Sequence, residues 1–201
     1  MSRGMHTATL AGLAQMLTLL VGCTVTRVPL NTPASYPIAR KVPLHVELRI
    51  KAEYATYEFK QSGLQTYRFD HGLRENAEVV ARSVFERVTV RDPTEPPVAA
   101  DAVLVPAIVT VQRTFPSSAF GEAHCFMEIE WRVEDPRGQV VWLATTRGEG
   151  TGKLGMSFEQ EARAREQFQA MSDAAFRKGY EKMIAAQELR AFARTVPGGG
   201  A

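Results

Sequence analysis

The sequence predicts an α+β fold, a two-layer sandwich in which two helices cover one face of a mixed sheet of four to five strands. Three patterns predict it. A strand, a helix and a short second strand follow one another between residues 44 and 90, three strand patterns fill residues 102–146, and a long helical pattern comes last. A right-handed crossover through the first helix makes the first two main strands parallel, and an antiparallel meander then extends the same sheet.

The first half of the predicted domain begins with a strand over residues 44–51, where apolar and polar side chains alternate. The segments YATYEF and TYRF, within residues 54–69, predict an irregular hairpin rich in tyrosine. Residues 88–90 predict a short strand and residues 92–101 a loop. Between the hairpin and this strand lies a helix with Asp70 as its candidate N-cap and an apolar stripe of Leu73, Ala77, Val80, Val84 and Phe85.

The second half begins with a long strand over residues 102–115, in which Pro106 indicates an edge position or a bulge. The turn signal DPRG pairs residues 123–134 with residues 139–146 as a hairpin. The first strand of this hairpin alternates cleanly, so that one face carries Cys125, Met127, Ile129, Trp131 and Val133.

The glycine-rich stretch GEGTGKLG, residues 148–155, is expected to be a flexible connection from a strand to a helix. It does not fit a phosphate-binding loop, because the first glycine and the serine or threonine after the lysine are both missing at the required positions. Ser157 and Gln160 then form a candidate capping box, which opens a helix that extends to about Gln187.

The first 22 residues have the features of an export signal, since Arg3 is basic and the chain from Thr7 to Gly22 carries no charge. The apolar stretch is short and interrupted, whereas a transmembrane helix needs about 20 mainly apolar residues. It ends in Leu20-Val21-Gly22-Cys23, which resembles the lipobox of bacterial lipoproteins.

This resemblance implies cleavage between Gly22 and Cys23, acylation of Cys23 with fatty acids, and attachment of the mature chain to a membrane through that lipid. Thr24 stands where an aspartate would retain such a protein at the inner membrane. The family's sorting rule therefore implies an outer-membrane protein that faces the periplasm.

The chain divides into four predicted parts. Residues 1–22 are the signal peptide, residues 23–41 a proline-containing tether, residues 42–193 a single α+β domain, and residues 194–201 a disordered tail. Fully extended, residues 24–41 could reach about 50 to 60 Å at about 3.3 Å per residue, which would let the domain stand off the membrane.

The charge balance excludes strong electrostatic attraction to nucleic acid or to an anionic surface at long range. The whole chain has 24 basic and 22 acidic side chains, and removal of the signal removes only one of them, Arg3. With Cys23 assigned to lipid, Cys125 has no intramolecular partner. We expect Cys125 to be a small buried side chain, and a reactive thiol is the alternative.

No catalytic set, metal site or cofactor is predicted. The histidines His45, His71 and His124 are scattered, and Glu128 and Glu130 lie on a strand face that we expect to be solvated. The candidate binding surface consists of the aromatic side chains of Tyr54, Tyr57 and Tyr67, together with Lys153 of the glycine-rich stretch. The alternative is that these rings simply pack in the core.

The leading interpretation is a non-enzymatic, lipid-anchored accessory or scaffolding module of the cell envelope that binds a protein partner. A glycan- or lipid-binding domain is the alternative, and a hydrolase is the third. The order of the predicted elements is similar to that of the lipopolysaccharide-assembly lipoproteins and of the N-terminal domain of TolB-type periplasmic proteins, an analogy that does not carry function by itself.

Overall fold

The computed structural model describes residues 24–33, 35–37, 40–54, 57–61, 65–92, 94–115, 121–153 and 159–196. The predicted signal peptide and the lipidation site, Gly22 and Cys23, lie outside these ranges. In the described part of the chain, no helix is long and apolar enough to cross a membrane.

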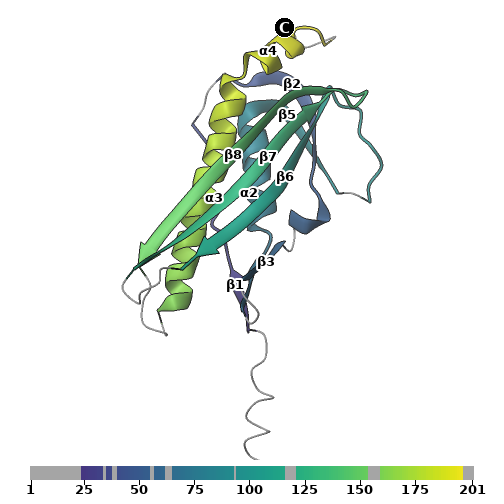
Figure 1. The fold of residues 1–201 in the computed structure, drawn as a ribbon. Helices are drawn as coiled ribbons and strands as arrows, with labels where there is room; N and C mark the ends of the chain where they lie inside the picture. Colours follow the sequence, from purple (N-terminus) through teal and green to yellow (C-terminus); the bar gives the residue numbers. More distant parts are fainter. Residues whose placement is uncertain are drawn as a thin grey trace, which may run out of the picture.

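The predicted α+β class and the mixed sheet are confirmed (Figure 1). The large sheet has the strand order β5-β2-β6-β7-β8, with β2 parallel to both β5 and β6, and with β6, β7 and β8 forming an antiparallel meander. Its strands are β2 (Val42–Arg49), β5 (Phe85–Arg91), β6 (Ala102–Thr114), β7 (Glu122–Glu134) and β8 (Val140–Lys153).

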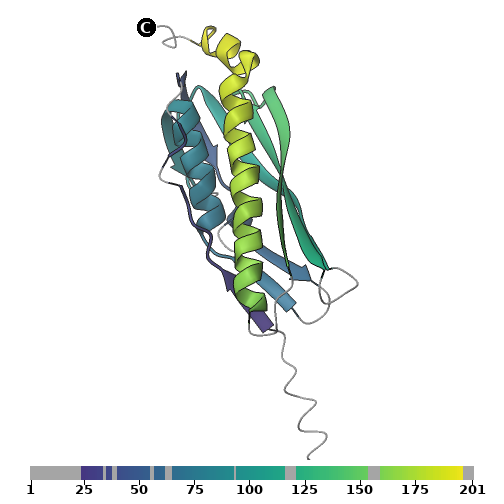
Figure 2. The same cartoon turned by 90° about the vertical axis from the view of Figure 1, so that its left-hand side faces the viewer.

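The two main helices lie on the same face of this sheet, as predicted (Figure 2). Helix α2 (Gly72–Val84) connects to β5, and the long helix α3 (Gln160–Ala185) follows β8. The short helices are η1 (Ala52–Tyr54) and α4 (Gln187–Ala193), and α4 is the last helix of the described residues.

The predicted helix ends are partly wrong. The N-cap of α2 is His71 and not Asp70, and it makes no hydrogen bond through its side chain. The last helix does not run unbroken to Gln187, because Ala186 is extended and separates α3 from α4. This break turns the chain so that Leu189 and Ala193 are buried in the core. The predicted capping serine, Ser157, lies outside the described residues.

The predicted alternation in β7 is confirmed, because all five side chains of the inward set are buried. Trp131 is fully buried, donates a hydrogen bond from Nε1 to Thr146 Oγ1 at 2.9 Å and meets the ring of Phe176 edge-on. The β7–β8 hairpin turns at Asp135-Pro136-Arg137-Gly138, where Gly138 has a φ of 81° that favours glycine. β6 is an inner strand of the sheet, but Pro106 lies beyond the residues of β6 that pair with β2, so β7 is the only paired neighbour of this position among the described residues.

The predicted flexible glycine loop is wrong, because Gly148, Gly150 and Gly152 lie inside β8. These glycines occupy every second position and face helix α3. A Cβ on Gly150 would overlap the backbone of Gln167, and one on Gly152 would lie 2.6 Å from Gln167 Nε2. These three glycines therefore let the backbone of α3 lie directly on the strand. The high local glycine content explains why the sequence predicted a loop here.

A second, three-stranded sheet has the order β1-β4-β3. Its strands are β1 (Thr24–Val28), β3 (Tyr57–Gln61) and β4 (Gln65–Phe69). The antiparallel β3–β4 pair is the tyrosine-rich hairpin that the sequence predicts, and β1 adds to it in parallel.

The described part of the predicted tether is packed on the body and is not a free spacer. Residues 24–28 form β1, and the side chains of Val28, Leu30 and Tyr36 are buried in the core. The physical reason is that burial of these three apolar side chains stabilises the packed segment by more free energy than is lost with the conformational entropy of a free linker.

The free edge of β8 is covered by lysines of α3. Lys182 Nζ donates to the carbonyl oxygen of Thr145 at 2.9 Å, and Lys178 Nζ donates to that of Arg147 at 2.9 Å. Lysines along an exposed edge strand hinder its pairing with another chain.

Candidate functional site

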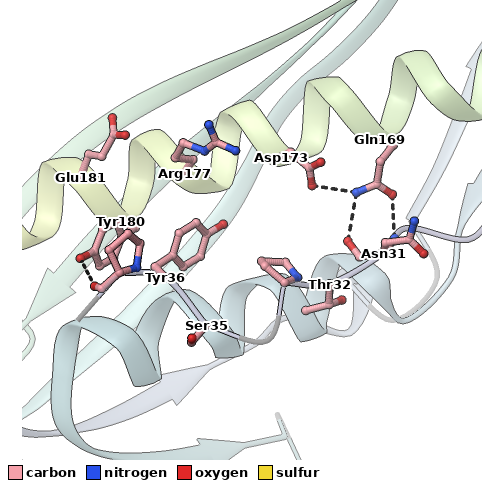
Figure 3. Close-up of a pocket in the computed structure, with 11 residues that line it drawn as sticks. Asn31, Thr32, Ser35, Tyr36, Gln169, Asp173, Arg177, Tyr180 and Glu181 are labelled. Atoms are coloured by element: carbon pink, nitrogen blue, oxygen red, sulfur yellow. Dashed lines mark hydrogen bonds between the residues drawn. The ribbon is translucent and has the colours of Figure 1, made fainter. Parts of the chain in front are cut away.

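A groove of about 550 Å³ lies between α3 and the N-terminal residues 31–33 and 35–37 (Figure 3). The walls come from segments that are far apart in the sequence. The groove is lined by Asn31, Thr32, Pro33, Ser35, Tyr36, Pro37, Gln169, Asp173, Arg177, Tyr180 and Glu181.

Two sets of contacts hold the N-terminal segment to α3, one at each end of the groove. At one end the Asn31 N–H donates to Gln169 Oε1 at 2.7 Å, and Gln169 Nε2 donates back to the Asn31 carbonyl at 3.0 Å. At the other end the Tyr180 hydroxyl donates to the carbonyl of Pro37 at 2.7 Å, and the ring of Tyr180 stacks on Tyr36 with centroids 4.9 Å apart. The groove opens between these two attachments (Figure 3).

The helix side of the groove presents alternating charges. Asp173, Arg177 and Glu181 are spaced four residues apart, so they lie on one face of α3. Asp173 Oδ1 also accepts a hydrogen bond from Gln169 Nε2 at 2.7 Å, which fixes its position beside the Asn31 attachment. The exposed Arg177 and Glu181 remain open to solvent in the described structure.

The hydroxyl of Tyr36 is held in its protonated form. Burial raises the pKa of Tyr36 to about 12, the carboxylates of Asp173 and Glu181 add to the rise, and Arg177 opposes it. At neutral pH this hydroxyl is therefore a hydrogen-bond donor and not a base. The rings of Tyr36 and Tyr180 are only 8% and 6% exposed, so they form a wall and not an open stacking platform for a sugar.

The structure does not gather the predicted binding residues into one surface. Tyr54 and Tyr67 are buried at 0% and 1% exposure, and Tyr57 is half-buried. The Tyr67 ring packs on Phe168 of α3 with centroids 4.9 Å apart, as the core-packing alternative expects. Lys153 is exposed at the end of β8, opposite Glu122 of β7.

Cys125 is a free, buried side chain, as predicted. Burial raises the pKa of its thiol to about 11, which keeps the thiol protonated and unreactive at neutral pH. His45 is engaged with Thr89 Oγ1 at 2.9 Å. Among the described residues, no three His, Cys, Asp or Glu side chains are grouped so that they could hold a metal ion.

Sequence reasoning missed the groove. Asn31 and Gln169 are 138 positions apart, and no local pattern links them. A usable signal was present in the apolar Leu30 and Tyr36, because a solvated linker has little reason to carry large apolar side chains.

No protein-family model and no curated protein matches this sequence. Among solved structures, the fold is similar to a Xanthomonas campestris protein of family DUF330, with 10% identity and a TM-score of 0.50 over 80% of this chain and 95% of that chain. A minor lipoprotein from Acinetobacter baumannii has 13% identity and a TM-score of 0.43, over 74% of this chain and 94% of that chain. The first similarity shows a common fold.

Proposed function

We propose that this chain is a lipid-anchored accessory protein of the bacterial cell envelope, which binds a protein partner and catalyses no reaction. Acylated Cys23 would hold it on the periplasmic side of the outer membrane. The lipobox Leu20-Val21-Gly22-Cys23 supports the anchor, because a basic start, an apolar run and this motif coincide at the distances that lipoprotein signals have.

The groove along α3 is the observation that carries the partner-binding role. One wall is formed by residues that belong to no helix or strand, and among the described residues nothing hydrogen-bonds the backbone of Thr32 or Ser35. An extended peptide can pair with such backbone groups, while side-chain groups beside it supply specificity. The charged row of Asp173, Arg177 and Glu181 would select side chains of complementary charge.

The anchor is tested with Cys23→Ala in the full chain. We expect the variant to remain unprocessed and unacylated, whereas the wild-type chain is cleaved, acylated and found in the outer-membrane fraction. The measurement is metabolic labelling with a fatty acid, together with membrane fractionation. Normal processing and acylation of the variant would overturn the lipoprotein assignment.

The groove is tested by photo-crosslinking in native membranes, with the crosslinking amino acid placed at Ser35. The matched control position is Thr145, which is also exposed but lies on β8 outside the groove. We expect a protein adduct at position 35 that protease digests and that is absent at position 145. A protease-resistant adduct would favour a glycan or lipid ligand, and equal labelling at both positions would contradict the groove as the binding site.

A charge reversal sharpens this test. Arg177→Glu turns the mixed row on α3 into a fully acidic one, and we expect it to weaken crosslinking at position 35 by about tenfold, as for a central charged contact of an interface. Arg137→Glu, in the exposed β7–β8 turn, makes the same charge change far from the groove and should leave the adduct unchanged.

A further inference from the structure

The outer face of the three-stranded sheet is basic. Its inner face carries Tyr67 and Phe69, which pack on Phe168 of α3, so the alternate residues point away from the body. The strand registers arrange these outward residues in two rows across the sheet. One row is Arg27, Arg68 and Glu58, and the other is Val25, Thr66 and Lys60.

Three cations therefore share this face with one carboxylate. Arg68 forms an ion pair with Glu58, its cross-strand neighbour. Arg27 and Lys60 are exposed and make no ion pair within the described residues. Val25, two residues before Arg27 in β1 and in the same row as Lys60, is 50% exposed and adds an apolar contact.

This face is adjacent in the chain to the proposed lipid anchor. Cys23 directly precedes Thr24, the first residue of β1. At about 3.3 Å per residue in a strand, the Cα of Arg27 lies no more than about 13 Å from the Cα of Cys23. Lys60 lies in the row of Val25, two strands across, which is about 10 Å at the usual strand spacing.

Residues 24–33 and 35–37 pack on the domain and do not supply the free length that a tether would have. Because β1 is part of the folded body, a lipid on Cys23 brings the three-stranded sheet to the membrane with it. Figure 1 shows β1 and β3 together at the end of the molecule opposite α4. Both cations would then lie within about one or two Debye lengths of the surface, where charges act on phosphate groups.

We propose that the outer face of the β1-β4-β3 sheet rests on the membrane and that Arg27 and Lys60 bind the headgroups of anionic phospholipids. This inference rests on the proposed anchor at Cys23. The chain as a whole is nearly neutral, so long-range attraction does not recruit it. The local basic face acts only after the anchor has brought it to the surface.

The test uses the acylated full-length mature protein in two kinds of vesicle, one of phosphatidylcholine and one with about a third of it replaced by phosphatidylglycerol. Lysines are labelled with acetic anhydride, an uncharged reagent, and labelling at Lys60 is compared with that at Lys41, which is exposed near the start of β2. We expect the Lys60-to-Lys41 ratio to fall about threefold in the anionic vesicles. About 1 M NaCl, where the Debye length is about 3 Å, should restore it.

Two variants test whether the basic face itself causes the protection of Lys60. Arg27→Glu should return the labelling of Lys60 in anionic vesicles to its value in neutral vesicles, because it removes the positive pair. Arg137→Glu makes the same change of charge in the β7–β8 turn and should leave the ratio as in the wild type. Equal ratios in both vesicles, with the protein still membrane-bound, would overturn the lipid-binding face and favour another occupant. Failure of the protein to be acylated at all would instead overturn the proposed anchor.

Discussion

Gly148 of β8 lies directly beneath the backbone of Met171 in helix α3, so close that a Cβ on the glycine would overlap the carbonyl oxygen of Met171. The same contact brings Ala175 against this glycine, with its Cβ 2.8 Å from the position that a Cβ would take. Both obstacles belong to a regular helix in the core, and neither is the end of a flexible side chain. A larger residue at this position must push the helix away from the sheet.

We therefore expect Gly148→Ala to lower the free energy of unfolding by about 3 kcal/mol, at the upper end of the usual cost of overpacking. Chemical denaturation followed by circular dichroism measures it. Thr151→Ala, at an exposed position in the same strand, is the control and should change stability by less than about 0.5 kcal/mol. A Gly148→Ala variant as stable as this control would show that α3 does not rest on the glycine stripe.

Glu47 and Arg91 form a buried ion pair, with Arg91 Nε 2.7 Å from Glu47 Oε1; the side chain of Glu47 is 1% exposed and that of Arg91 is 9% exposed. The second carboxylate oxygen accepts the Val98 N–H at 3.2 Å, and Arg91 Nη1 donates to the carbonyl of Glu95 at 2.7 Å. This pair thus fastens the connection between β5 and β6 to strand β2. Glu47→Gln leaves the buried guanidinium without its carboxylate and should cost about 3 kcal/mol at pH 7.

The pH dependence has a definite sign. Burial by itself raises the pKa of Glu47, but hydrogen bonds from Arg91, the Val98 N–H and Arg49, together with the charge of Arg91, outweigh it and hold the pKa below 4.5. Its contribution to stability is therefore present above pH 4.5 and is lost as the pH falls through the folded pKa. The difference in the free energy of unfolding between the wild type and Glu47→Gln should therefore become smaller at acidic pH. Glu149→Gln, in an exposed pair, should show neither effect.

The thiol of Cys125 should be inert in the folded protein. Its pKa is about 11, so little thiolate forms at neutral pH. Its side chain is only 1% exposed, so a reagent cannot reach it in the folded protein. We expect no reaction with a neutral maleimide at pH 7.5 within the time that labels the unfolded chain completely. Mass spectrometry measures the label. Rapid labelling of the native protein would contradict the packed position of this thiol against β8.

The raised pKa of Cys125 also predicts how the stability of the protein changes at high pH. Because the folded pKa exceeds the ordinary value of 9.0, the protonated thiol contributes stability that is present below pH 9 and lost as the pH rises toward about 11. Cys125→Ala removes this dependence, so its stability should fall less steeply between these two pH values. Parallel curves for the two proteins would contradict the raised pKa.

Tyr180→Phe tests the attachment of the N-terminal segment. The variant keeps the ring stacked on Tyr36 but loses the hydrogen bond to the Pro37 carbonyl, which should cost about 1 kcal/mol. Backbone amide exchange should accelerate at Tyr36, whose N–H donates to Ser83 Oγ at 3.3 Å. Tyr57→Phe is the control, because its hydroxyl makes no hydrogen bond within the described residues. Unchanged exchange at Tyr36 in the Tyr180 variant would mean that the hydroxyl does not hold the segment.

Local patterns predicted the parts of the fold that depend on near neighbours. The alternation in β7 and the turn at Asp135 could both be predicted from the local sequence, because only a few consecutive residues determine a strand face or a tight hairpin. The parallel pairing of β1 with β4 could not be predicted in this way, because two strands, β2 and β3, and the short helix η1 separate Thr24 from its partner Gln65 in the chain. The glycines of β8 misled for a different reason. These glycines are needed because helix α3 packs directly against them, a contact that lies far away in the sequence. From composition alone, a glycine-rich stretch of this kind is interpreted as a loop.

The groove lay beyond sequence reasoning for the same reason as the β1–β4 pair. Its two walls come from opposite ends of the chain, and the spacing of Asp173, Arg177 and Glu181 is as typical of a solvated helix face as of a binding site. The second wall exists because the N-terminal segment is attached to α3, by hydrogen bonds between Asn31 and Gln169 and by the stacking of Tyr36 on Tyr180.

The lysines on the edge of β8 also set how copies of this protein can meet. Two molecules approaching edge to edge would bring the ammonium groups of Lys178 and Lys182 on one copy toward those on the other, while the Thr145 and Arg147 carbonyls that a new strand needs are already occupied. Like charges facing each other across such a seam repel. These two lysines therefore oppose the pairing of two copies through the central part of this edge.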